Sequence, residues 1–245
     1  MPEMLAIDLG TRPYRTVLGW QRELCQAMRS GLVEQDLLLL VEHPDVITLG
    51  RGARPGSLPI PRAGLLAQGY EVFDIERGGD VTYHGPGQLV GYPIFDLNRH
   101  RRDLHWYLRR LEAALIGGLE RLGVAGERVE GLTGVWTGGE GGGRKIASIG
   151  IHVKQWVTFH GFALNVTTDL RRFDAIVPCG IEGVKMTSVA RELGGRYPGN
   201  SAELWQATGD AMVASVAEVF DLSPRSVPPG ELAPMFGNPA AAPTD

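Results

Sequence analysis

Cysteine, lysine and long apolar runs are all scarce in this sequence. Its 245 residues include two cysteines (Cys25 and Cys179), three lysines against 21 arginines, and no apolar run longer than Leu37 to Val41. A membrane-spanning helix needs about 20 apolar residues, so we expect a soluble protein. The first residues carry no basic leader, which argues against a secretory signal. Two cysteines without ligand-type spacing favour a reducing compartment, so we expect the protein in the cytoplasm.

The overall charge is slightly acidic. Lys and Arg number 24 and Asp and Glu 28, for a net charge of -4. We therefore expect neither nucleic acid nor a membrane surface as a partner. The exception is the segment 99–110, in which one carboxylate, Asp103, accompanies the arginines Arg99, Arg101, Arg102, Arg109 and Arg110. This segment is either a solvated helix face or a docking surface for an acidic protein.

Apolar spacing predicts more strands than helices. Four helices are expected, from about Pro13 to Met28 and at 61–68, 103–123 and 201–220. Strands are expected at 4–8, 36–42, 46–49, 133–137, 145–152 and 157–166, with two or three more between 70 and 97, and a mobile glycine-rich loop at 138–143. Because the strands do not alternate regularly with helices, the fold class is α+β, with a mixed, largely antiparallel sheet and flanking helices.

Composition also sets the expected domain limits. The apolar pattern runs to Leu222 and is long enough for one hydrophobic core, so we predict a single domain over residues 1–222. The segment 223–245 is rich in proline and alanine and has few large apolar residues. We expect it to be a poorly ordered tail.

The best candidates for chemistry are Cys179 and Lys145. Cys179 lies between Pro178 and Gly180, so its thiol is expected on a constrained turn. A thiolate attacks acyl carbons readily, and an amine can exchange a proton with it, so Cys and Lys together suffice for acyl transfer. The alternative is an inert buried cysteine. A pair of Cys179 with His84 ranks lower, and a zinc site that adds His152 and His160 is disfavoured because no recognised ligand spacing occurs.

A glycine-rich segment, Arg77 to Gln88, is the second candidate. Its small residues would let the backbone approach a ligand, and its amides could bind an oxyanion. A simple glycine hairpin would look similar. The spacing is not that of a phosphate-binding loop.

Four blocks in this order carry a resemblance to a known family. They are RGGDVTYHGPGQ at 77–88, RKIASIG at 144–150, HGFALN at 160–165 and PCGI at 178–181. Together they resemble the lipoyl(octanoyl) transferase family, over about residues 5–220. The departures are the glycine-rich stretch 138–143 and the proline-rich end of the chain.

The resemblance implies a fold related to biotin and lipoate protein ligases. It implies transfer of an octanoyl or lipoyl group from acyl carrier protein to a lysine of a lipoyl domain, in 2-oxoacid dehydrogenase complexes or glycine cleavage H protein, without cofactor or metal. Position matching makes Cys179 the acyl-thioester nucleophile and Lys145 its partner. The residues implied to line the acyl site are Arg77, Gly78, Gly79, Asp80, Val81, Thr82, Tyr83, His84, Ser148, Ile149, Gly150, Gly161, Phe162 and Ala163.

Two other functions stay open at this point. The first is an ATP-dependent lipoate-protein ligase on the same fold, in which Lys145 would contact an acyl-adenylate and Cys179 would be incidental. The second is a noncatalytic module that binds a lipoyl domain or a carrier. The implied carrier is acidic, so the arginines at 99–110 are a candidate docking surface, although a solvated helix face is the simpler interpretation.

Overall fold

The structure is a computed structural model that describes residues 1–138, 143–181 and 183–236. Its elements in chain order are β1 (Glu3–Thr11), α1 (Tyr14–Arg29), β2 (Asp36–Glu42), β3 (Val46–Leu49), η1 (Pro55–Ser57), α2 (Arg62–Ala67), β4 (Glu71–Asp74), β5 (Val81–His84), β6 (Gln88–Ile94), α3 (Leu104–Arg121), β7 (Val135–Thr137), β8 (Arg144–Lys154), β9 (Val157–Asn165), η2 (Leu170–Ala175), η3 (Pro178–Gly180), β10 (Lys185–Met186), α4 (Val189–Leu193), α5 (Ser201–Val219), β11 (Ser223–Ser226) and η4 (Pro229–Met235).

A mixed eight-stranded sheet forms the centre of the molecule. Its order is β10-β8-β9-β6-β2-β1-β11, and β7 pairs with β8. Four pairs are antiparallel: β2 with β6, β6 with β9, β9 with β8, and β8 with β7. Three pairs are parallel: β1 with β2, β1 with β11, and β10 with β8. This confirms the predicted α+β fold with a mixed sheet. The predicted neighbours, the strand of Lys145 and the strand 157–166, are β8 and β9 and pair directly.

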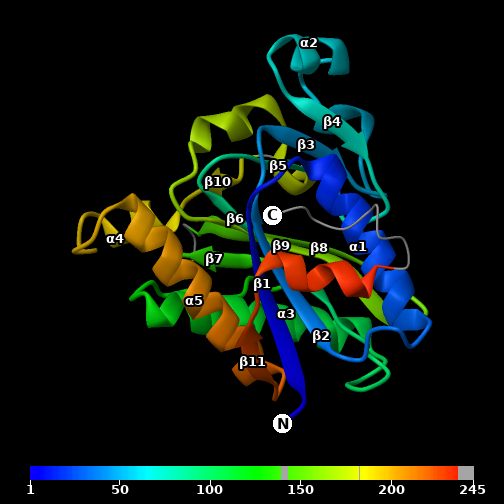
Figure 1. Cartoon of the computed structure of the whole chain (residues 1–245). Helices are drawn as coiled ribbons and strands as arrows, with labels where there is room; N and C mark the ends of the chain where they lie inside the picture. The colour runs from blue at the N-terminus through cyan, green and yellow to red at the C-terminus, as the bar shows by residue number, and fades with distance from the viewer. Residues whose placement is uncertain (139–142, 182, 237–245) are drawn as a thin grey trace.

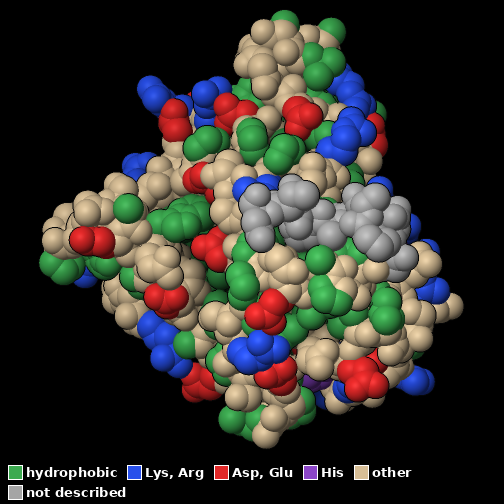
Figure 2. Space-filling model, in the orientation of Figure 1, with side chains coloured by type: hydrophobic (Ala, Val, Ile, Leu, Met, Phe, Trp, Pro, Cys, Tyr) green, Lys and Arg blue, Asp and Glu red, His purple; other side chains and the backbone are tan. Residues whose placement is uncertain are grey.

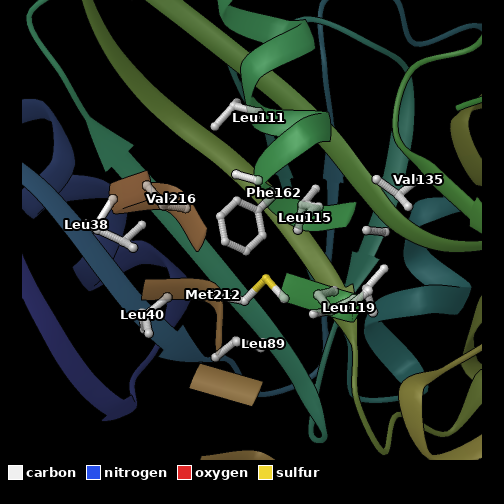
Figure 3. Packing of buried hydrophobic residues seen from close by; sticks show 14 of the residues in the cluster. Leu38, Leu40, Leu89, Leu111, Leu115, Leu119, Val135, Phe162, Met212 and Val216 are labelled. Carbon is white, nitrogen blue, oxygen red and sulfur yellow. The ribbon is translucent and has the colours of Figure 1, made fainter. Parts of the chain in front are cut away.

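Helices cover both faces of the large sheet (Figure 1). Helix α1 packs on one face against Leu37 and Leu39 of β2, and α3 and α5 pack on the other against Leu38 and Leu40. Because both faces of β2 are buried, its apolar residues are contiguous instead of alternating. Figure 3 shows the α3 and α5 side, where Phe162 lies among leucines of the helices and strands.

A smaller sheet stands at one end of the molecule. Strands β4, β3 and β5 form it in that order, and α2 lies beyond β4 at the top of Figure 1. Strand β5 packs against the turn η3. The arrangement brings the glycine-rich segment around β5 next to Cys179.

The predicted helix at 103–123 is confirmed as α3, which begins directly after its N-cap residue Asp103. Asp103 accepts a hydrogen bond from the Trp106 backbone N–H at 3.0 Å, which satisfies a donor that the first helical turn leaves free. The predicted helices at 13–28, 61–68 and 201–220 are confirmed as α1, α2 and α5. No helix in the described residues is long and apolar enough to cross a membrane.

The expected tail differs from the structure over residues 223–236. Strand β11 pairs in parallel with β1, matching Leu5 to Arg225, and Leu232 of η4 is fully buried. The prediction of a poorly ordered tail is therefore wrong for this segment, because an exposed edge strand pairs through its backbone and needs no apolar pattern. Residues 237–245, and 139–142 of the predicted mobile loop, lie outside the described residues. A single catalytic domain over 1–222 stays a prediction.

Candidate functional site

Lys145 and Cys179 meet in space although 34 positions separate them. The Nζ atom of Lys145 lies 3.2 Å from the Sγ atom of Cys179. The hydroxyl of Ser148, three residues further along β8, lies 3.9 Å from the same sulfur. The structure therefore places the two residues expected to share a proton within hydrogen-bond distance.

Cys179 stands on a backbone turn of unusual conformation. Its φ is 58° and its ψ 16°, which is the left-handed region that residues with a side chain rarely adopt. Gly180 follows with φ 67°, and a Cβ atom there would lie 2.4 Å from the Asp80 carboxylate. Glycine is thus required at position 180. The Val177 N–H donates to the Ser57 carbonyl at 3.0 Å and ties the turn to η1.

The side-chain nitrogen of Lys145 is enclosed by a backbone carbonyl, an aromatic ring and the Cys179 sulfur. The side chain is 2% exposed, and its Nζ donates to the Thr133 carbonyl at 3.0 Å. The Trp136 ring lies 5.2 Å from Nζ, at cation–π distance. These contacts fix the amine next to the thiol.

A cavity of about 250 Å3 lies beside the pair and is bordered by both residues. Of the fourteen residues expected to line the acyl site, twelve border it: Arg77, Gly79, Asp80, Val81, Thr82, His84, Ser148, Ile149, Gly150, Gly161, Phe162 and Ala163. Gly78 and Tyr83 do not. The Tyr83 hydroxyl instead bonds to Asp45 at 2.7 Å, and Gly78 donates its N–H to Ile151.

Strand alternation decides which of these residues present side chains to the cavity. Ser148 and Ala163 pair across β8 and β9 and face it. Ile149 and Phe162 are the next pair, and on the opposite face of the sheet Phe162 lies in the core (Figure 3) and Ile149 packs against it. Phe162 and Ile149 thus border the cavity, as the resemblance implies, while their side chains pack in the core.

The sequence interpretation missed several residues that border the cavity. They are Tyr14, Val90, Tyr92, Gly131, Leu132, Thr133, His160 and Ile181. Tyr14 belongs to the apolar stripe of α1, where it is indistinguishable from a core residue. Val90 and Tyr92 could have been found from the alternation of β6, because Val90 pairs with Ala163.

A buried guanidinium lies at the edge of the cavity. Arg77 is 7% exposed and donates from Nη2 to the carbonyl and hydroxyl of Thr48, at 2.7 and 2.9 Å. Nη1 donates to the Gly78 carbonyl, and Nε has no hydrogen-bond partner among the described residues. Burial lowers the pKa of Arg77, yet a guanidinium stays protonated at neutral pH. The site therefore contains a fixed positive charge.

Two buried histidines favour the neutral form: His84, which borders the cavity, and His43, whose ring lies 6.2 Å from that of His84. Burial lowers the pKa of His84 to about 3 and that of His43 to about 4. The Nδ1 atom of His84 contacts Gln88 Oε1 at 2.8 Å, and the His84 ring stacks on Tyr14. His84 is thus held by Gln88, which supports the Cys–Lys pair over the Cys–His alternative.

Neither the metal site nor the arginine segment gains support. No group of three or more metal-ligating side chains gathers in the described part of the chain. Three of the five arginines have carboxylate partners: Arg99 with Asp36, Arg101 with Asp103, and Arg109 with Glu112. Figure 2 shows acidic and basic side chains interspersed over the visible face. Docking at 99–110 stays a prediction.

Comparison with known proteins identifies the family. The lipoyl protein ligase A/B catalytic domain family matches residues 13–212. An octanoyltransferase of Gloeobacter violaceus is 52% identical over 181 residues, which cover 74% of this chain and 78% of that protein. The chain belongs to the lipoyl(octanoyl) transferase family. A second family member, the octanoyltransferase of a Nostoc species, is 45% identical over 89% of this chain and 92% of its own length.

Solved structures of more distant proteins share the fold of this family member. Lipoate-protein ligase A bound with ATP superposes with a TM-score of 0.73 at 17% identity, covering 93% of this chain and 89% of that one. A bipartite lipoate protein ligase of Thermoplasma acidophilum gives 0.71 at 16% identity, covering 93% and 88%. These similarities confirm the predicted lipoate ligase-like fold.

Proposed function

We propose that the protein transfers an octanoyl or lipoyl group from acyl carrier protein to a lysine of lipoyl domains through a thioester on Cys179. The single observation that supports this mechanism is the 3.2 Å contact between Lys145 Nζ and Cys179 Sγ at the wall of the cavity. A nucleophilic thiol next to a proton-exchanging amine is the arrangement that acyl transfer needs.

In the first half-reaction the Cys179 thiol passes its proton to Lys145, and its sulfur attacks the carbonyl carbon of the donor thioester. A tetrahedral oxyanion forms, and backbone amides near Cys179 or His84 are its proposed donors. The carbon–sulfur bond to the carrier then breaks. The carrier thiol leaves with a proton from Lys145, and the octanoyl group stays on Cys179.

In the second half-reaction the acceptor lysine attacks the thioester on Cys179. The attacking amine gives up a proton to Lys145, and the departing sulfur recovers one from it. The product is an amide, which is more stable than the thioester, so the transfer needs neither ATP nor another cofactor. The carrier must leave before the lipoyl domain reacts, which predicts ping-pong kinetics.

The cavity supplies the binding energy for the acyl chain. An octanoyl group has six methylenes, and burial at about 0.8 kcal/mol each contributes roughly 5 kcal/mol. Val90 and Ala163 provide apolar side chains on the sheet side of this cavity. We assign the same cavity to both chemical steps, because the acyl group never leaves it between them.

The proposed partners follow from this chemistry. They are octanoylated acyl carrier protein as donor, and lipoyl domains of 2-oxoacid dehydrogenase complexes and glycine cleavage H protein as acceptors, all in the cytoplasm. If segment 99–110 docks the acidic donor, Arg101→Glu with Arg102→Glu raises the KM for the carrier in a salt-dependent manner. An unchanged KM would remove this segment from the proposal.

Mass spectrometry of the intact protein tests the mechanism. Incubation with octanoyl carrier protein should add one octanoyl group, which hydroxylamine removes and Cys179→Ala prevents. An adduct that persists in Cys179→Ala would overturn the assignment. Transfer from free octanoate only in the presence of ATP would show a ligase instead, and partner binding unaffected by Cys179→Ser without any transfer would show a noncatalytic module.

A further inference from the structure

A second cleft, of about 660 Å3, begins at the turn that carries Cys179. Pro178 borders this cleft, Cys179 borders the acyl cavity, and Ile181 borders both. The cleft and the cavity therefore adjoin at the turn that carries Cys179. A thioester bound with its acyl chain in the cavity would direct the rest of the donor toward the cleft.

The cleft has an excess of positive charge. Among its described lining residues are four cations (Arg144, Arg171, Lys185 and Arg191) and one carboxylate, Asp174. This charge contrasts with the net charge of -4 for the whole chain.

Two of the four cations are already neutralised and two are available. Arg144 forms two hydrogen bonds to the Glu192 carboxylate, at 2.9 and 2.8 Å, and Arg171 pairs with Asp169 in the same manner. Lys185 and Arg191 form no ion pair with the described residues, and both are exposed. Lys185 is held on β10, in register with Arg144 of β8, so its backbone position is fixed by the sheet.

We propose that this cleft binds the phosphate-bearing arm that links the acyl thioester to its carrier, with Lys185 and Arg191 as the anion-binding residues. The inference rests on the proposed function, because it assigns a place to the part of the donor beyond the sulfur. A flexible linear arm fits a cleft better than it fits a flat surface, and a phosphodiester in it meets two cations that form no ion pair with the described residues.

Two small donors without any carrier protein test the proposal. S-octanoyl-4′-phosphopantetheine carries the phosphate, and S-octanoylpantetheine lacks it. In both cases the octanoyl group moves from the donor sulfur to Cys179 and the donor thiol is released. We expect the phosphorylated donor to acylate Cys179 at least about tenfold faster at low salt and subsaturating concentration. Raising the salt concentration should shrink this ratio.

The double variant Lys185→Gln with Arg191→Gln should bring the ratio of the two rates close to one. The matched control is Lys154→Gln, an exposed lysine at the far end of β8 from Arg144, which should leave the ratio as in the unaltered protein. Equal rates for the two donors in the unaltered protein would overturn the proposal, as would a ratio that the double variant does not change.

The second half-reaction tests whether the cleft binds the donor arm or the acceptor lipoyl domain. Protein acylated beforehand on Cys179 should transfer octanoate to a lipoyl domain equally well with and without the double substitution. If only this step slows, the cleft binds the acidic acceptor and the proposal is wrong. Failure of the proposed function is distinct, because neither donor would then produce an adduct on Cys179 in any variant.

Discussion

The ring of Phe162 occupies the space beside Gly91 on the neighbouring strand. The two residues are paired across β6 and β9, and a Cβ atom at position 91 would lie 2.1 Å from the Phe162 ring. The glycine lets the aromatic ring lie flat over the strand and reach Leu115 and Met212 of the helices (Figure 3). The same strand pair carries Val90 and Ala163 on its cavity face, so this contact supports the acyl site from behind.

Gly91→Ala should therefore destabilise the fold. Forcing a methyl group into a packed core costs about 1–3 kcal/mol, and we expect a loss of this size in urea unfolding. Gly19→Ala is the matched control, because a Cβ atom there meets nothing within 4 Å and the residue lies in helix α1. The control should be neutral or more stable by up to about 1 kcal/mol. Equal stability of the two variants would contradict the packing argument.

Lys145→Met should slow formation of the octanoyl adduct by about 10²- to 10⁴-fold, the usual contribution of a positioned proton donor or acceptor. Methionine fills a similar volume and cannot exchange a proton. The rate is measured by rapid quenching and intact mass, with the unfolding midpoint recorded for the same sample. Lys154→Met changes an exposed lysine on the same strand and should be fully active. Near-normal acylation by Lys145→Met would remove Lys145 from the proton path.

Gly180→Ala should reduce acylation of Cys179 by about a hundredfold, because the added methyl group meets the Asp80 carboxylate and displaces the sulfur. The control Gly123→Ala separates this clash from backbone strain. Gly123 also has a positive φ, 79°, but a Cβ atom there meets nothing within 4 Å. The control should lose some stability and keep its acylation rate. If both variants are equally slow, strain and not displacement is the cause.

The neutral histidines predict how stability depends on pH. The unfolded chain binds a proton at each histidine below about pH 6.5, whereas the folded protein resists it until about pH 4 at His43 and about pH 3 at His84. The unfolded state therefore holds more protons in this window, and stability falls as the pH falls, by at most about 1.4 kcal/mol per pH unit for each histidine.

Urea unfolding from pH 7 to pH 4 measures this slope. His84→Gln removes one of the two groups and should make the profile flatter. His105→Gln, at an exposed position, should leave the slope unchanged. A slope identical in all three proteins would show that His84 does not resist protonation in the folded state.

Much of the fold and both residues of the proposed pair could be predicted from the sequence. Helix α3 was found because Asp103 caps it and leucines recur with a helical period. The meeting of Lys145 and Cys179 was predicted from chemistry and from the four sequence blocks. The geometry of the turn at Cys179 could be anticipated only in outline, from Pro178 and Gly180.

The failures have physical causes. Strand β11 pairs through its backbone at the sheet edge, and its exposed residues show no apolar alternation. That the side chains of Phe162 and Ile149 point away from the cavity could not be predicted, because the face of a strand depends on its register with neighbours, which one sequence does not show. Tyr14 reaches the cavity from a helix whose buried stripe looks like any core-facing stripe.

The left-handed backbone conformation of Cys179 lowers the stability of the fold at a residue that the proposed activity requires. A side chain in that conformation costs about 1–2 kcal/mol, and the fold retains it at the position of the proposed nucleophile. Cys179→Gly would release that strain, offset in part by the greater freedom of glycine in the unfolded chain. The inactive glycine form should therefore tolerate heat at least as well as the enzyme, so that selection for thermal resistance alone would favour discarding the nucleophile.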